Sequence, residues 1–242
     1  MSVVTYKLDL VKPGRSAFDQ QGYSEEARPE GREAYKLSYL VEDVLGVAEA
    51  LDATKFHLVG DDWGGGVGWN IAANFPEKIS SFTSLSTPHP AAFYEALANP
   101  ECEQLQKSEY IKVFIRDNSE DIFLKNDRSR LKKMYQDIPP RDVEEYLKVL
   151  GHKQALSAAL NWYRANFDPG NKEEPLGQVT VPTLYIWGTE DIALGPYAAK
   201  ATEKFVQPDR YTFKPLDGSG HWILESDSVL ITELILKHLK KY

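Results

Sequence analysis

Residues 55–66 read KFHLVGDDWGGG, an apolar run that ends in two adjacent aspartates and a run of glycines. The apolar run FHLVG predicts a buried strand, GGGVGWNIAANF predicts a helix that packs closely through its glycines, and ISSFTSLS predicts a second strand. Strand, helix and strand joined by short loops form a parallel unit, because parallel neighbours need a crossover connection. This stretch restricts the chain to folds built on a parallel sheet.

The rest of the chain continues the same pattern on both sides of a helical segment. VPTLYIWG and YTFKPL predict strands, alternation predicts a half-buried strand at residues 4–10, and helical spacing predicts helices at 33–51 and about 227–241. Residues 91–166 contain several helical stretches and no convincing strand. We therefore expect an α/β core at residues 1–90 and 167–242, mostly parallel and flanked by helices, with an inserted helical lid at 91–166.

Composition limits the partners of this fold. The net charge is -8 and the pI is near 5.2, with no basic run beyond the terminal KHLKKY, which argues against nucleic acid or an anionic membrane surface. The single Cys102 excludes an internal disulfide and a cysteine-based zinc site. The N-terminal stretch lacks the apolar core of a signal peptide, and no apolar run reaches about 18 residues. These features predict a cytoplasmic protein that does not enter a membrane.

The aspartate pair fits a known strand-to-helix turn. Gly60 and Gly64 flank Asp62 in the pattern small-x-nucleophile-x-small, whereas a centre at Asp61 would put bulky Trp63 at a small position. Asp62 is therefore the candidate nucleophile and Asp61 a bystander. A glycine-rich turn without chemistry remains an alternative. A phosphate-binding loop does not, because GxGxxG cannot be aligned here, neither GKS nor GKT follows, and two carboxylates repel phosphate.

Two further residues complete a candidate triad. Asp191 follows the strand VPTLYIWG and His221 follows the strand YTFKPL, at the strand ends where catalytic groups of α/β sheets belong. Asp191 would orient His221, and His221 would activate a water molecule. The other histidines are less well placed, in a strand, a Pro-rich turn, the lid and the last helix: His57, His89, His152 and His238.

An aspartate nucleophile predicts a particular reaction. A carboxylate that attacks an electrophilic sp³ carbon forms an alkyl ester, which water activated by His221 then hydrolyses. This chemistry suits the opening of an epoxide or the displacement of a halide, and it suits acyl transfer poorly.

GDDWGG, TEDIALG, GSGHW and the lid segment ALNWYR resemble the epoxide hydrolases of the α/β-hydrolase fold, from about Phe18 to the C-terminus. The resemblance implies a small neutral organic substrate, water as co-substrate, and no metal or organic cofactor. It also implies that Tyr163 of NWYR hydrogen-bonds to the epoxide oxygen. The family has a second lid tyrosine, for which Tyr110 is the nearest candidate, although Val113 stands at the expected position.

One family motif is absent. Residues 1–16 contain neither a histidine nor the HGxP motif that supplies an oxyanion donor in the family, which leaves the backbone N–H of Trp63 as the other donor. The chain looks shortened or altered at its N-terminus, and we expect impaired activity and an exposed sheet edge that favours homo-oligomers. Two alternatives stay open: a haloalkane dehalogenase-like hydrolase that uses the Trp63 indole, and a catalytically silent relative that binds a ligand or partner through the lid.

Overall fold

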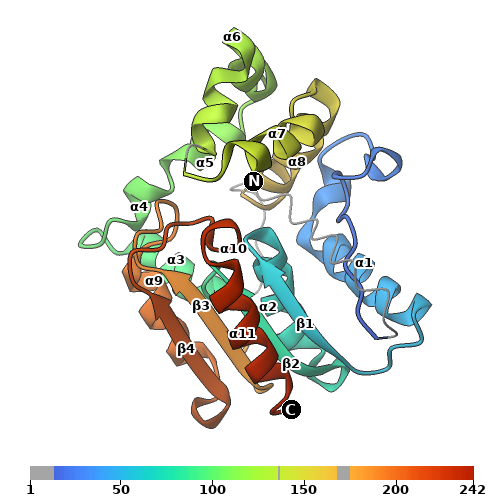
Figure 1. The fold of residues 1–242 in the computed structure, drawn as a ribbon, viewed down its shortest axis with the longest axis vertical. Helices are drawn as coiled ribbons and strands as arrows, with labels where there is room; N and C mark the ends of the chain where they lie inside the picture. The colour runs from blue at the N-terminus through green and yellow to red at the C-terminus, as the bar shows by residue number, and fades with distance from the viewer. Residues whose placement is uncertain (1–13, 136, 168–174) are drawn as a thin grey trace.

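The computed structural model describes residues 14–135, 137–167 and 175–242. Its centre is a parallel sheet in the order β1-β2-β3-β4 (Figure 1), formed by β1 (Phe56–Asp61), β2 (Ile79–Leu85), β3 (Thr183–Gly188) and β4 (Tyr211–Leu216). The parallel α/β architecture predicted from the sequence is therefore confirmed. The strand predicted at residues 4–10 lies outside the described residues.

Helices cover both faces of this sheet. On one face, α2 (Trp63–Asn74) approaches so closely that a Cβ on Gly68 would lie 2.3 Å from the ring of Phe82. On the other face, Ile231 of α11 (Ser228–Leu239) packs in one apolar cluster with Leu85 and Leu184. The remaining core helices are α1 (Leu37–Ala50), α3 (Pro90–Ala98), α9 (Pro196–Ala201) and α10 (Ile223–Ser226). The two central strands, β2 and β3, are thus buried between two helical layers.

The strands end at one edge of the sheet. Asp61 pairs with Leu85 at the ends of β1 and β2, and Gly188 pairs with Leu216 at the ends of β3 and β4. Because all strands are parallel, the loops that follow them converge at this edge.

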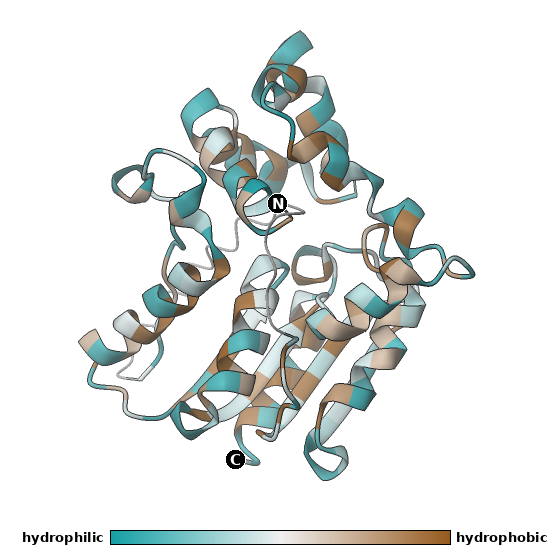
Figure 2. Cartoon of the chain, turned by 180° about the vertical axis from the view of Figure 1, so that it is seen from behind, coloured by the Kyte–Doolittle hydropathy of each residue, from teal (hydrophilic) through white to brown (hydrophobic). Residues whose placement is uncertain are grey.

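Five lid helices lie over the edge where the strands end (Figure 1): α4 (Gln104–Lys107), α5 (Glu109–Phe114), α6 (Ser119–Met134), α7 (Pro140–Leu150) and α8 (Lys153–Asn166). Hydrophobic residues concentrate on the sheet, while the outer turns of the lid helices are largely hydrophilic (Figure 2). Residues 91–135 and 137–166 contain no strand, as predicted. The division at residues 91 and 166 stays a prediction, and α3 packs against α9 of the core.

A buried ion pair fixes α8 within the lid. Arg164 donates from Nη1 to Glu120 Oε1 at 2.8 Å and from Nη2 to Glu120 Oε2 at 2.9 Å, and Nη2 also donates to the carbonyl of Arg116 at 2.7 Å. The neighbouring Trp162 donates from its indole to the carbonyl of Gln21 at 2.9 Å. Because a buried ion pair needs good geometry and additional hydrogen bonds to offset desolvation, these contacts hold α8 in one position over the sheet.

The helix predicted at residues 33–51 is interrupted. A 3-10 turn covers Glu33–Tyr35, Lys36 is extended with ψ 143°, and α1 begins at Leu37. Asn166 at the end of α8 explains the break, because it donates to the carbonyl of Tyr35 at 2.9 Å and accepts from the N–H of Leu37 at 2.8 Å. This cap comes from a residue more than a hundred positions away, so local spacing could not predict it.

The prediction that FHLVG is fully buried is wrong. Val59 is 41% exposed and His57 is also exposed. β1 is the edge strand of the described sheet, so only part of its surface is covered. Across the described residues, every helix falls short of the length and apolarity that a bilayer crossing requires.

Candidate active site

Asp62 occupies a strained turn between β1 and α2. Its backbone has φ 49° and ψ -119°, a conformation that residues with side chains rarely adopt. Its carbonyl accepts from Thr87 Oγ1 at 2.6 Å and from the N–H of Gly66 at 3.1 Å. A Cβ on Gly60 would lie 2.2 Å from the carbonyl oxygen of Gly64, so the turn excludes a side chain there. This is the geometry that the small residues of the motif predict.

Asp62, Asp191 and His221 meet at the edge where the strands end. His221 Nδ1 lies 2.9 Å from Asp191 Oδ2, and His221 Nε2 lies 3.5 Å from Asp62 Oδ2. Asp191 is buried, and its Oδ1 accepts from the backbone N–H groups of Ala193 at 2.7 Å and Leu194 at 2.9 Å. Asp191 thus holds the imidazole ring of His221 through Nδ1, while Asp62 faces Nε2. Three segments far apart in the sequence form this arrangement.

The two carboxylates favour the charged form of the histidine. Burial lowers the pKa of His221, but the negative charge of Asp191 and its hydrogen bond, followed by those of Asp62, outweigh burial and raise the pKa well above 6.5. Asp191 contributes more to this rise than Asp62 does.

The two lid tyrosines lie together beside Asp62. Tyr163 of α8 and Tyr110 of α5 hydrogen-bond to each other, with ring centroids 6.2 Å apart. Burial first, and then the charge of Asp62, raise the pKa of both phenols. Both side chains therefore remain neutral hydrogen-bond donors next to the carboxylate.

Trp63 contributes to this arrangement in two ways. It is the first residue of α2, so its backbone N–H directly follows Asp62. Its side chain hydrogen-bonds to Tyr163, and the two rings are 5.2 Å apart and almost perpendicular. Since an indole can only donate, the Trp63 N–H is directed at the phenol oxygen.

The charge of Asp62 also contributes to raised pKa values of two more tyrosines, which the sequence motifs did not identify. Burial and then Asp62 raise the pKa of Tyr23, and burial, Tyr23 and Asp62 raise the pKa of Tyr135. Tyr135 also stacks on Tyr146 of α7, with centroids 5.1 Å apart. Tyr23 precedes α1 and Tyr135 directly follows α6, and neither lies in one of the motifs described above.

Asp61 behaves unlike its neighbour. Burial first, and then the charge of Asp62, raise its pKa to about 8. Ser86 Oγ lies 3.4 Å from Asp61 Oδ1 and donates to the carbonyl of His221 at 3.1 Å. Asp61 is therefore mainly protonated at pH 7, which removes the repulsion between the adjacent aspartates. No motif in the sequence indicated that burial beside Asp62 would keep the adjacent carboxyl mainly protonated.

This raised pKa predicts how stability depends on pH. Between pH 4 and 8 the folded chain keeps a proton on Asp61 that the unfolded chain loses, so Asp61 lowers stability as the pH rises through this window. Asp61→Asn cannot ionise, and we expect it to stabilise the fold by a few kcal/mol, in order of magnitude, at pH 8 and much less near pH 4. Urea unfolding between pH 4 and 9 measures the difference. Asp217→Asn, the same change at an exposed aspartate, is the control, and a gain in Asp61→Asn that does not grow with pH would contradict the assignment.

None of the described His, Cys, Asp and Glu side chains forms a group of three or more suited to a metal ion. The arrangement offers a carboxylate in a strained turn, a histidine with its acid partner, and neutral phenol donors near the carboxylate. These groups suit a two-step substitution at carbon.

Comparison with known proteins places the chain in a family. Residues 16–228 match the alpha/beta hydrolase fold family. The chain is 33% identical over 229 residues to the AB hydrolase superfamily protein YfhM of Bacillus subtilis (strain 168), covering 92% of this chain and 79% of that protein. It is 30% identical over 236 residues to epoxide hydrolase 4 of Mus musculus, covering 93% of this chain and 65%, less than two thirds, of that protein.

Solved structures agree with this placement. The epoxide hydrolase of Bacillus megaterium, solved in complex with an inhibitor, superposes with a TM-score of 0.82 at 26% identity, covering 92% of this chain and 82% of that chain. The chain belongs to the alpha/beta hydrolase fold family, and within that family it is similar to proteins named epoxide hydrolases.

Proposed function

We propose that this chain hydrolyses an epoxide to a diol through an ester of Asp62. The observation that carries the proposal is the position of Asp62, in a strained turn 3.5 Å from His221 and near enough to Tyr163 and Tyr110 for its charge to raise the pKa of both phenols. Relatives that bear the name epoxide hydrolase support it. A small neutral organic epoxide and water are the substrates, and the residues named here require no metal or cofactor.

In the first step an Asp62 oxygen attacks an epoxide carbon, and the bond from that carbon to the ring oxygen breaks. The electron pair stays on the oxygen, which Tyr163 and Tyr110 stabilise by donating hydrogen bonds and a proton. The strained turn holds the carboxylate at the start of α2, so little reorganisation precedes the attack. The product is a hydroxyalkyl ester of Asp62.

In the second step the ester is hydrolysed. Esterification removes the negative charge of Asp62, so the pKa of His221 falls and the ring can release a proton to the phenolate formed in the first step. Neutral His221, held by Asp191, then takes a proton from water, which attacks the ester carbonyl carbon. The Trp63 backbone N–H stabilises the resulting oxyanion. When the oxyanion collapses, the bond from the carbonyl carbon to the alkyl oxygen breaks, and that oxygen takes the proton from His221 and leaves as the diol. The Asp62 carboxyl group then gives its proton to His221, which restores the starting carboxylate and imidazolium.

Tyr163→Phe is expected to slow alkylation of the enzyme by about 10²-fold or more while changing ester hydrolysis less, because the phenol acts on the oxygen released in the first step. Rapid-quench measurement of the ester and the diol separates the two rates. Tyr35→Phe removes another buried phenol, which donates to the carbonyl of Pro29, and should leave alkylation unchanged. Normal alkylation in Tyr163→Phe would limit Tyr163 to packing.

The contacts of Trp63 argue against the haloalkane dehalogenase-like alternative. Its indole N–H, the group that would bind a leaving halide, is engaged by Tyr163. We expect little or no chloride or bromide release from simple alkyl halides. Release at a rate comparable to diol formation would favour the dehalogenase-like activity.

A catalytically silent relative is the candidate from another class, and the absence of HGxP from residues 1–16 favours it. With one identified oxyanion donor, we expect ester hydrolysis to be slower by about 10²–10³-fold than in an enzyme with two. A slow enzyme would still form the ester, whereas a silent relative would not.

A single turnover in heavy-oxygen water tests the proposal. The enzyme, in excess over each of a panel of aryl and alkyl epoxides, should incorporate the label into the Asp62 carboxyl group, because water attacks the carbonyl carbon of the ester. Mass analysis of the peptide that holds Asp62 detects it. Label in the diol alone would contradict the covalent scheme, and no diol with any epoxide would favour the silent relative.

A further inference from the structure

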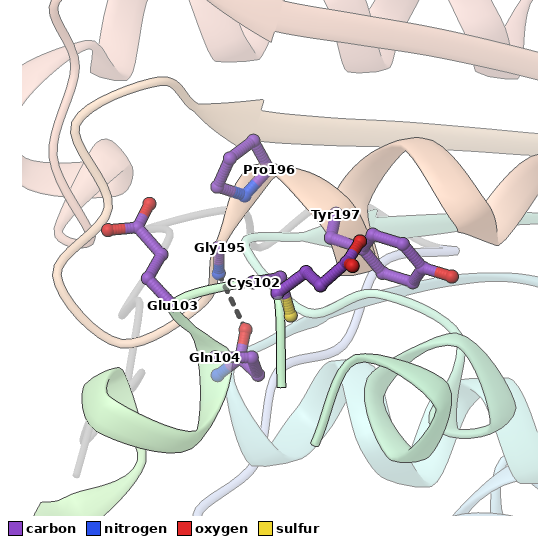
Figure 3. Close-up of a pocket in the computed structure, with 7 residues that line it drawn as sticks. Cys102, Glu103, Gln104, Gly195, Pro196 and Tyr197 are labelled. Carbon is purple, nitrogen blue, oxygen red and sulfur yellow. Dashed lines mark hydrogen bonds between the residues drawn. The ribbon is translucent and has the colours of Figure 1, made fainter. Parts of the chain in front are cut away.

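The loop that carries Asp191, residues 189–195, has a second set of contacts away from the triad. We call it the acid loop. Gln104 of α4 is 1% exposed, donates from Nε2 to the carbonyl of Ala193 at 2.8 Å, and accepts at Oε1 from the N–H of Gly195 at 2.7 Å. Its Nε2 also donates to Ser108 Oγ at 2.9 Å. Figure 3 shows the Gln104 side chain directed at Gly195, beside a pocket of about 370 Å³.

A second residue of α4, Lys107, contacts Asp191 directly. Lys107 Nζ donates to the backbone carbonyl of Asp191 at 2.7 Å. Its methylene chain passes close to Gly195, where a Cβ would lie 3.5 Å from Lys107 Cδ and 3.3 Å from Gln104 Oε1. The acid loop is thus contacted by α4 at Asp191, Ala193 and Gly195.

These contacts lie on the peptide groups that support the Asp191 carboxylate. The N–H groups of Ala193 and Leu194 donate to Asp191 Oδ1, while Oδ2 faces His221. Gln104 binds Ala193 O, which is in the same peptide group as the Leu194 donor, and Gly195 N, which is in the next peptide group. A shift of the loop would therefore move the donors, the carboxylate and the imidazole together.

We propose that Gln104 and Lys107 are positioning residues that hold Asp191 against His221, so that the lid helix α4 sets the geometry of the catalytic pair in the core. The residue types suit the task. A glutamine amide can donate to a carbonyl and accept from an N–H at the same time, and a lysine can reach a carbonyl across a glycine. Without Gln104, the carbonyl of Ala193 and the N–H of Gly195 would lose their buried hydrogen-bond partner. Because unpaired buried polar groups are costly, the acid loop would then rearrange to satisfy them. The catalytic consequence rests on the proposed epoxide hydrolysis, whereas the positioning itself does not.

Two substitutions with matched controls test this inference. Gln104→Leu and Lys107→Met should slow hydrolysis of the alkyl ester by about 10- to 100-fold and slow alkylation less, since a small misplacement of the base affects the second step. Gln106→Leu, the same change at an exposed position of α4, and Lys112→Met, at a surface lysine paired with Glu109, should match the wild type. Lys107→Arg, which can still donate to the carbonyl, should restore most of the rate.

A measurement without substrate separates this inference from the proposed function. The Nδ1–H proton of His221 should give a low-field NMR signal, assigned by its loss in His221→Gln. In Gln104→Leu and Lys107→Met this signal should move upfield or broaden, and its titration midpoint should fall, because the bond to Asp191 weakens. Should Gln104→Leu not fold, Lys107→Met carries the test alone.

Unchanged NMR signals and unchanged ester hydrolysis in the folded variants would overturn the inference. If no epoxide alkylates the wild type, the proposed function fails while the NMR comparison still decides whether α4 positions Asp191. A shifted signal in that case would support the positioning role for another reaction.

Discussion

Asp62→Ala is expected to abolish turnover, with a loss of about 10⁴-fold or more, as is usual when the nucleophile of a triad is removed. In the proposed mechanism the variant loses the carboxylate that attacks the carbon of the substrate, and Asp61, which is mainly protonated, does not substitute for it. Diol formation at saturating epoxide measures the loss. Because alanine at position 62 keeps the β1–α2 connection, circular dichroism and thermal unfolding should show an intact fold.

Asp61→Ala is the matched control for this result. The same deletion one residue earlier removes a carboxyl that is mainly protonated at pH 7 and that lies outside the His221–Asp191 pair. We expect its activity to remain within about 10-fold of the wild type, the size of a change in a neighbouring polar group. Equal losses in both variants would show that Asp62 is not a unique nucleophile.

His221→Gln is expected to accumulate the covalent ester. Attack by Asp62 on the epoxide needs no base, but hydrolysis of the ester does, so the second step should slow by about 10²–10⁴-fold, the usual contribution of a general base. Intact-protein mass spectrometry under excess epoxide should show an increase equal to the mass of the substrate, located on the peptide that contains Asp62.

His152→Gln, the same change at the residue that precedes α8, should turn over normally and show no adduct. If His221→Gln carries no adduct although the wild type forms diol, the covalent scheme fails and His221 would instead activate water for direct attack on the epoxide. The two variants together therefore test the order of the steps as well as the base.

Local patterns predicted the elements that position the site. The apolar runs of β2 and β3 and the glycines of α2 are short-range signals, and the structure has these elements where the sequence placed them. The order of Asp62, Asp191 and His221 along the chain carried information for a similar reason. Each follows a strand, and the ends of parallel strands meet at one edge wherever the chain crosses the sheet in one direction.

Contacts between residues that are distant in sequence could not be predicted from local patterns. The break at Lys36 is produced by Asn166, and Tyr110 becomes a partner of Tyr163 only because α5 packs against α8. The side chain of Gln104 meets a backbone carbonyl 89 residues further along the chain. Periodicity and motifs describe neighbours in sequence, so they do not report which lid residues reach the core.

The sequence by itself determined the parallel α/β architecture, the turn that presents Asp62 and the candidate partners in their order, because strand periodicity and the steric demands of a tight turn act over a few residues. Only the tertiary structure decided the charges and the surroundings of these groups. Burial beside Asp62 raises the pKa of Asp61 to about 8, two carboxylates raise the pKa of His221, and α4 contacts the acid loop. Desolvation and charge–charge interactions depend on distance in space, and folding sets those distances.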